Sequence, residues 1–284
     1  MHDVPPPTSA PSDTAAGTTG VKQRLKLLIT VKTYPVPSRK YVETVCTAGI
    51  TEDGRWIRLY PVSFRYLDSR HQYRLYDWVE VSVRKRPPGR DHRKESYEPL
   101  GPPTILDHVS ARSNWEERKR IILPHAAASI EAIHAGHRTD GQSLGIIRPR
   151  SIGRVSVEGD ASEWSPSQRA ALEQLALFGP QRKPLERPGH RFFYQFTCDD
   201  PECQGHRLQV VDWGLYELYR KIRSAEGAAA AVQKTKEKLA ELVAADREAH
   251  FYVGMHSRFP SFMVLGMFSP RRQPPDGEIR MRFD

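Results

Sequence analysis

The feature that most constrains the fold is a series of short β-type segments, separated by turn residues, in the first part of the chain. Residues 41–50 and 55–60 are rich in β-branched and aromatic side chains, and Glu52-Asp53-Gly54 between them is typical of a tight turn. Together they predict a β-hairpin. Many short strands at close spacing predict a small antiparallel β-barrel. Further strands are expected at residues 25–31, 77–84, 96–97 and 104–109.

The rest of the chain mixes helices and strands, which indicates an α+β protein. Ser113 and Glu116 have the spacing of a capping box and predict the start of a helix. A helix at residues 225–246 has one apolar stripe, which we expect to pack on its own domain; the alternative is that it docks a protein partner. The chain is therefore divided into a disordered tail (1–20), a β-barrel block (21–110), a helical linker (111–142), a second α+β block (143–270) and a flexible tail (271–284).

Positive charge is spread unevenly along the sequence. Of the 284 residues, 43 are Lys or Arg and 34 are Asp or Glu, which gives a formal net charge of +9. The first 20 residues contain Asp3 and Asp13 but no Lys or Arg, so the remaining residues carry +11. A basic folded part favours an anionic partner, most commonly a nucleic acid. The alternative is a solvated surface charge that has no partner.

Composition excludes several classes of protein. No apolar run approaches the ~20 residues that a bilayer-spanning helix needs, so a membrane protein is not expected. The N-terminus lacks the basic-then-apolar pattern of a signal peptide. Three cysteines are too few for a disulfide framework and indicate a reducing cytoplasm.

The sharpest chemical signal is a cluster of thiols and an imidazole in the second block. Cys198, Cys203 and His206 have C-x4-C-x2-H spacing, and Pro201 and Gly205 allow tight turns between them. Thiolates and a neutral imidazole are ligands that zinc prefers in tetrahedral geometry. The sequence therefore predicts a zinc knuckle with a structural role, whose fourth ligand comes from elsewhere. The candidates for that ligand are His190, His250, His256 and Asp212.

Two alternatives to a structural zinc site stay open. A water in the fourth position would make the site hydrolytic, and the protein would then be a metal-dependent hydrolase or nuclease. Its general base would be Asp212, Asp199 or His256. Asp212 lies between a strand and a helix, where the more ordinary role of an Asp is that of an N-cap. The second alternative is a pair of thiols and a His that bind no metal.

Cations and aromatic rings alternate along the barrel block. Strands with such side chains can pair Arg with phosphates and stack bases on rings. Residues 84–94 add six cations within eleven residues, which can neutralise phosphates without reading sequence. Ordinary barrel core and a solvated loop are the alternatives. The expected phosphate contacts are Lys40, Arg55, Arg58, Arg65, Arg84, Lys85 and Arg86.

Several familiar catalytic signatures are absent. The sequence contains no GxxxxGK[ST], GxGxxG or HExxH motif. The sequence therefore identifies no catalytic residue.

One set of segments is spread along most of the chain: residues 31–38, 43–49, 56–62, 143–149, 251–254 and 262–266, together with Cys198, Cys203, His206 and Asp212-Trp213. In these segments the chain resembles a group of prokaryotic proteins of unassigned function. The resemblance covers most of residues 25–270 and implies an opening block similar to modules built of paired OB-type barrels. Such barrels commonly bind single strands or oligonucleotides.

These observations predict an α+β protein in which an OB-like barrel is followed by helices and by a second β-rich block with a zinc knuckle. The expected function is binding of nucleic acid, single-stranded DNA or RNA, in the cytoplasm. The expected context is a nucleic-acid processing or defence system.

Overall fold

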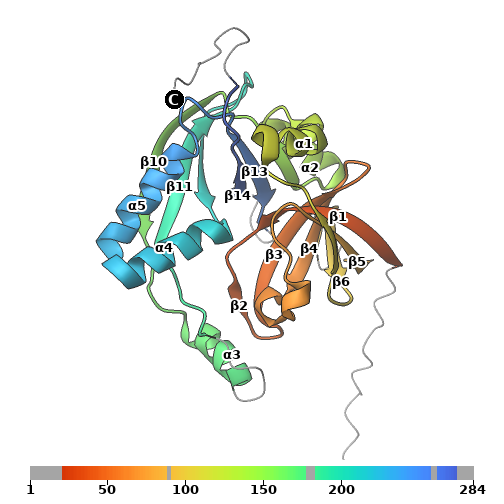
Figure 1. Cartoon of the computed structure of the whole chain (residues 1–284), viewed down its shortest axis with the longest axis vertical. Helices are drawn as coiled ribbons and strands as arrows, with labels where there is room; N and C mark the ends of the chain where they lie inside the picture. Colours follow the sequence, from red (N-terminus) through yellow and green to blue (C-terminus); the bar gives the residue numbers. More distant parts are fainter. Residues whose placement is uncertain (1–20, 88–90, 177–182, 257–260, 274–284) are drawn as a thin grey trace, which may run out of the picture.

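The computed structural model describes residues 21–87, 91–176, 183–256 and 261–273. The predicted tail at 1–20, and that at 271–284 beyond residue 273, lie outside the described residues. Two seven-stranded sheets and the helices that cover them make up the described part, which confirms the mixed α+β class. Figure 1 shows the first sheet coloured red to yellow and, across from it, the second sheet with its two blue helices.

The first sheet contains a closed five-stranded barrel. The strands are β1 (Lys22–Lys32), β2 (Val36–Ser38), β3 (Val42–Thr51), β4 (Trp56–Val62), β5 (Asp77–Lys85), β6 (Ser96–Pro99) and β7 (Thr104–His108). Strands β1, β3, β4, β6 and β5 pair in that order, and β5 pairs with β1 to close the ring. The predicted barrel is confirmed. It is not purely antiparallel, however, because β4 and β6 pair in parallel.

Alternate residues of the barrel strands face two different cores, as the two-residue period of a strand requires. Leu25, Leu27 and Ile29 of β1 point into the barrel. Leu28 and Val31, on the other face of β1, belong to a second core. That second core also contains residues of the other sheet, so part of the outside of the barrel is buried and one core joins the two halves. Its members from the second half are Leu144, Ile146, Tyr252, Leu265 and Phe268.

The second sheet has the order β10-β11-β12-β14-β13-β9-β8. Its strands are β8 (Ala126–Ala127), β9 (Leu144–Ile147), β10 (Ser151–Gly159), β11 (His190–Thr197), β12 (His206–Val210), β13 (His250–Met255) and β14 (Phe262–Phe268). The helices of the chain are α1 (Arg112–Ile122), α2 (Ile130–Asp140), α3 (Pro166–Ala176), α4 (Trp213–Glu226) and α5 (Ala228–Glu241), with short 3-10 turns η1 (Phe64–Tyr66), η2 (Ser69–His71) and η3 (Leu123–His125). In the described residues, no helix has both the length and the apolarity to cross a bilayer.

Two helix predictions are corrected. The helix expected at 225–246 is the shorter α5, Ala228–Glu241, because Gly227, with φ +90° and ψ 172°, interrupts the helical backbone between α4 and α5. Helix α5 buries Ala231 and Leu239 against its own sheet. The predicted capping box is wrong as well, because Ser113 has φ +49° and the N-cap of α1 is Ala111.

Candidate functional site

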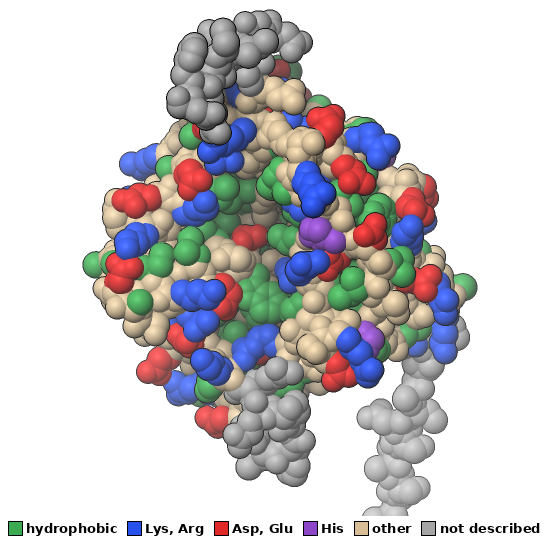
Figure 2. Space-filling model, in the orientation of Figure 1, with side chains coloured by type: hydrophobic (Ala, Val, Ile, Leu, Met, Phe, Trp, Pro, Cys, Tyr) green, Lys and Arg blue, Asp and Glu red, His purple; other side chains and the backbone are tan. Residues whose placement is uncertain are grey.

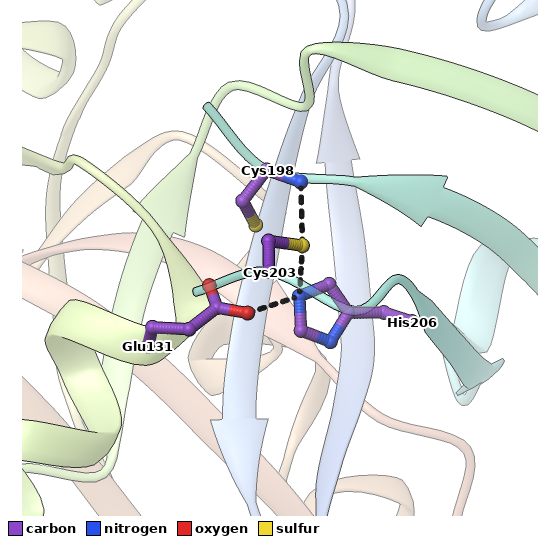
Figure 3. Close-up of side chains that lie close together, drawn as sticks. All are labelled: Glu131, Cys198, Cys203 and His206. Atoms are coloured by element: carbon purple, nitrogen blue, oxygen red, sulfur yellow. Dashed lines mark hydrogen bonds and ion pairs between the residues drawn. The ribbon is translucent and has the colours of Figure 1, made fainter. Parts of the chain in front are cut away.

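Four side chains of metal-ligating type converge beside the β11–β12 hairpin (Figure 3). Cys198 follows β11, Cys203 lies in the connecting turn, His206 begins β12 and Glu131 lies in the first turn of α2. Their ligand atoms all lie within 4.8 Å of one another. The Nε2 atom of His206 is 3.3 Å from the Sγ atom of Cys203 and 3.0 Å from a carboxylate oxygen of Glu131. In a tetrahedral zinc site, neighbouring donor atoms are about 3.5 Å apart.

Local backbone structure brings these four residues together. Gly205 has φ +88°, a conformation that glycine adopts readily, and it turns the chain into β12. Ser129 caps α2 by accepting a hydrogen bond from the N–H of Ala132. The Ser129 hydroxyl also donates to Asp200 in the Cys198–Cys203 turn, at 2.6 Å. The N-terminus of α2 is therefore fastened to the turn that carries the thiols.

The chemistry of the cluster fits a cation. Burial raises the pKa of the Cys198 thiol to about 12, so a thiolate at this position needs a nearby positive charge. The Oε2 atom of Glu131 is buried and has no hydrogen-bond partner among the described residues. The predicted Cys198, Cys203 and His206 thus do lie together, and Glu131 completes a group of four that could hold a metal ion.

The prediction of the fourth ligand is wrong, because all four predicted candidates lie outside the cluster. His190 bonds the hydroxyl of Tyr219, and His250 bonds the carbonyl of Glu248. Asp212 accepts a hydrogen bond from the N–H of Leu215 at 2.8 Å, so its predicted N-cap role is confirmed. His256 also lies outside the cluster, as does Asp199, a candidate general base for the hydrolase alternative. Asp199 pairs with Arg150 at the surface. Glu131 lies far upstream in the chain, and no local spacing signals it.

Asp212→Asn is expected to flatten the pH dependence of stability between pH 3.8 and about 6. Burial raises the pKa of Asp212 from 3.8 to about 6, so the folded state binds more protons than the unfolded state in this window. The free energy of unfolding therefore falls as the pH rises through it, by up to roughly 3 kcal/mol. Asn is as good an N-cap but does not titrate. Urea denaturation across the window measures this effect, and parallel pH curves for the two proteins would contradict it.

A cleft of about 820 Å³ lies between the barrel and the second sheet. One wall consists of residues 33–39 together with Thr44, Cys46, Arg58, Tyr60 and Arg93 from the barrel half. The other wall comes from β11, the end of β12, α4, β13, β14 and the segment around α3. Figure 2 shows a face that is hollowed between the two halves, with apolar side chains inside the hollow and Lys and Arg around it.

Arginines dominate the charge of this cleft. Among the lining residues that the structure describes, five are arginines and Asp160 is the one acid. Arg187 pairs with Asp160 and Arg191 pairs with Glu158, whereas no ion pair with a described carboxylate is found for Arg39. Aromatic rings lie among the cations. They belong to Tyr34, Tyr60, Trp164 and Tyr216.

A buried polar network joins the two halves below the cleft. Glu95, on the barrel side, accepts hydrogen bonds from the backbone N–H groups of Ser143 and Leu144 and from the Ser143 hydroxyl. Arg58 donates to the Ser143 hydroxyl at 3.0 Å and to the carbonyl of Met255. These side chains hold the barrel against β9 and β13, so hydrogen bonds between the two halves form the floor of the cleft.

Of the seven predicted phosphate contacts, Arg58 is the one that lines the cleft, and it is 2 % exposed. Lys40 and Arg55 are exposed elsewhere on the barrel, over the Tyr41 ring and beside Asp53 respectively. The remaining four predicted contacts have protein partners: Arg65 bonds Glu43 and the Lys183 carbonyl, Arg84 bonds Glu98, Lys85 bonds the Lys94 carbonyl, and Arg86 bonds the Tyr60 carbonyl. The phosphate-contact role of all seven stays a prediction.

Sequence reasoning missed four cleft arginines as site residues. Arg39 lies among the alternating cations and rings of the barrel block, and Arg93 lies in the basic segment 84–94, so both carried a signal. Arg187 and Arg191 follow the α3 segment, whose sequence has no charge pattern that marks them. Only the folded chain brings the four together.

Two family models match the chain side by side. One, described as a domain of unknown function (DUF8758), matches residues 23–124. The other, described as a domain of unknown function (DUF8757), matches residues 126–283, which is more than half of the chain. The chain belongs to the DUF8757 family. No curated protein matches it.

The DUF8757 region begins with β8 and contains all four residues of the metal-ligating cluster. The DUF8758 region contains the closed barrel. The cleft therefore lies between the two regions and takes residues from both. Their boundary falls inside the segment 111–142, and the division of the chain into a barrel block, linker and second block stays a prediction.

Proposed function

We propose that the protein binds single-stranded nucleic acid in the cleft between the DUF8758 barrel and the DUF8757 sheet. The observation that carries this proposal is the lining of the cleft, in which five arginines and four aromatic rings accompany one acid. Cationic side chains attract the phosphates of a strand, and rings offer faces on which bases stack.

The architecture of the barrel supports this proposal. We assign the barrel to the OB type, which is a five-stranded Greek-key barrel that binds oligonucleotides on its second and third strands and on the neighbouring loops. The second and third barrel strands here are β3 and β4, which contribute Thr44, Cys46, Arg58 and Tyr60 to the cleft. The loop before β3 and the loop between β5 and β6 contribute Arg39 and Arg93.

The size of the cleft favours a single strand over a duplex. A volume of about 820 Å³ is typical of pockets that enclose a small ligand. The major groove, which is only one part of a duplex, is about 12 Å wide. A whole duplex is therefore much larger than the cleft and cannot enter it. A strand that presents a few nucleotides at a time would fit.

We further propose that Glu131, Cys198, Cys203 and His206 hold zinc in a structural role. Two thiolates, one imidazole and one carboxylate are zinc ligands, and four protein ligands leave no open position for a reactive water. This argument weighs against the alternative of a metal-dependent hydrolase, which needs such a position.

Arg39→Glu is expected to weaken binding of a 15-mer of dT or U by about tenfold at low salt, since it replaces a phosphate contact with a repulsive charge. Filter binding across a salt series measures this, with a duplex of equal length for comparison. Arg55→Glu is the matched control, because Arg55 is an exposed barrel arginine that does not line the cleft. Absence of binding by the wild-type protein at ~50 mM salt would overturn the proposal. A larger effect of Arg55→Glu would place the binding surface elsewhere on the barrel.

A further inference from the structure

The floor of the cleft differs from its rim. Apart from Pro188 and the aromatic rings, four apolar side chains of the second half line the cleft: Val211, Met255, Met263 and Leu265. Met255 and Leu265 are each 1 % exposed, so this apolar surface lies deep. Phosphates gain nothing from apolar surface, whereas the face of an unstacked base does.

At the floor of the cleft, the barrel contributes a hydrogen-bond donor that lacks an acceptor. Arg58 is buried, and its Nε atom has no hydrogen-bond partner among the described residues, although its two terminal nitrogens are bonded. A buried donor without a partner costs about 1–3 kcal/mol. The edge of a nucleobase carries ring nitrogens and carbonyl oxygens that can accept such a hydrogen bond.

The charged groups of the rim suit phosphates. Arg39 is exposed, and the side chain of Arg187 is 24 % exposed and lies over the Trp164 ring, with 5.7 Å between the guanidinium carbon and the ring centroid. Tyr34 and Tyr216 are buried, at 8 % and 4 % exposed, and pack against each other with their ring centroids 5.3 Å apart. The cleft thus has cations and the Trp164 ring at its mouth, and apolar surface with one unused donor at its floor.

We propose that the floor of the cleft takes a single unpaired nucleobase turned out of its strand. The apolar side chains contact the face of the base and Arg58 Nε donates to its edge. The phosphates on either side of that nucleotide stay at the rim, beside Arg39 and Arg187. This inference rests on the proposed function and adds that one captured base, rather than a continuous stack, is the unit of recognition.

Cys46 offers a direct test, because this half-buried free thiol lines the cleft beside Arg58, with its Sγ atom 3.9 Å from a terminal nitrogen of that arginine. A bound base should shield it from iodoacetamide. At an oligonucleotide concentration of about ten times Kd, alkylation of Cys46 should slow about tenfold. Peptide mass spectrometry of the full-length protein measures the rate. Cys198 and Cys203, in the same digest, are internal controls that should not respond to the oligonucleotide.

Three 15-mers separate the outcomes: dT throughout, abasic throughout, and abasic with one central thymine. We expect the first and third to protect Cys46 equally, and the abasic strand to bind through its phosphates without protecting it. Binding of the dT strand without protection of Cys46 would overturn the captured base while leaving the proposed function intact. Equal protection by the fully abasic strand would overturn it as well. Failure of all three strands to bind would overturn the proposed function itself.

Discussion

Glu95→Ala is expected to destabilise the protein by about 3–5 kcal/mol, because two buried backbone N–H groups would lose their acceptor. Glu95 is 3 % exposed and accepts from the N–H of Ser143 at 2.6 Å and from that of Leu144 at 3.2 Å. Leu144 is the first residue of β9 and Ser143 is the residue before it, so both donors belong to the second half of the chain. The loss should therefore appear in urea denaturation as a lower midpoint for the whole protein.

Glu98→Ala is the matched control for this substitution. Glu98 lies in β6, three residues after Glu95, and pairs with Arg84 at 2.9 Å, but both side chains are about a quarter exposed. An ion pair of this kind contributes less than about 1 kcal/mol. Glu95→Gln, which keeps one acceptor oxygen, should fall between the two. Equal midpoints for Glu95→Ala and Glu98→Ala would show that the buried network does not hold the halves together.

Local signals explain why much of the barrel is predictable from sequence. The predicted hairpin at 41–50 and 55–60 corresponds to β3 and β4, which end and begin within two residues of those bounds. Its determinants are β-branched residues on either side of an Asp-Gly turn, all adjacent in the chain. The closure of the ring by β1 and β5, and the parallel pairing of β4 with β6, are contacts between distant segments and leave no local pattern.

Arg58 shows why the candidate site is harder to predict than the strands. Ile57 and Leu59 face the barrel core, and Arg58 between them faces the opposite side of β4. A two-residue period states which residues share a face but not what covers that face. Here the second half of the chain covers it, so a residue with the pattern of a surface cation is buried at the floor of a cleft.

The metal-ligating cluster divides in the same way. Cys198, Cys203 and His206 lie within one hairpin, and their spacing alone predicts that they meet. Glu131 reaches them from the first turn of α2, which packs against the hairpin through tertiary contacts such as the hydrogen bond from Ser129 to Asp200. The sequence offers several carboxylates and histidines for that position, and only the packing of α2 selects one.

Removing the metal is expected to lower the thermal midpoint by about 10 °C. A ligand that binds only the folded state adds roughly 4 kcal/mol when its free concentration is a thousand times Kd, and 1 kcal/mol shifts the midpoint of a protein of this size by about 2–4 °C. The purified wild-type protein should contain about one zinc ion per chain by elemental analysis, and a strong chelator should both release the zinc and shift the midpoint.

Cys203→Ser and Cys46→Ser separate loss of the metal from loss of a thiol. Cys203 is in the cluster, whereas Cys46 is a free thiol in the cleft wall, so Cys203→Ser should lose zinc and stability while Cys46→Ser keeps its zinc. Glu131→Ala should keep the ion with lower affinity, because two thiolates and an imidazole remain. Cobalt substitution reports this as a change in the visible spectrum. If zinc is absent from the wild-type protein and Cys203→Ser leaves the midpoint unchanged, then hydrogen bonds alone hold the four side chains together.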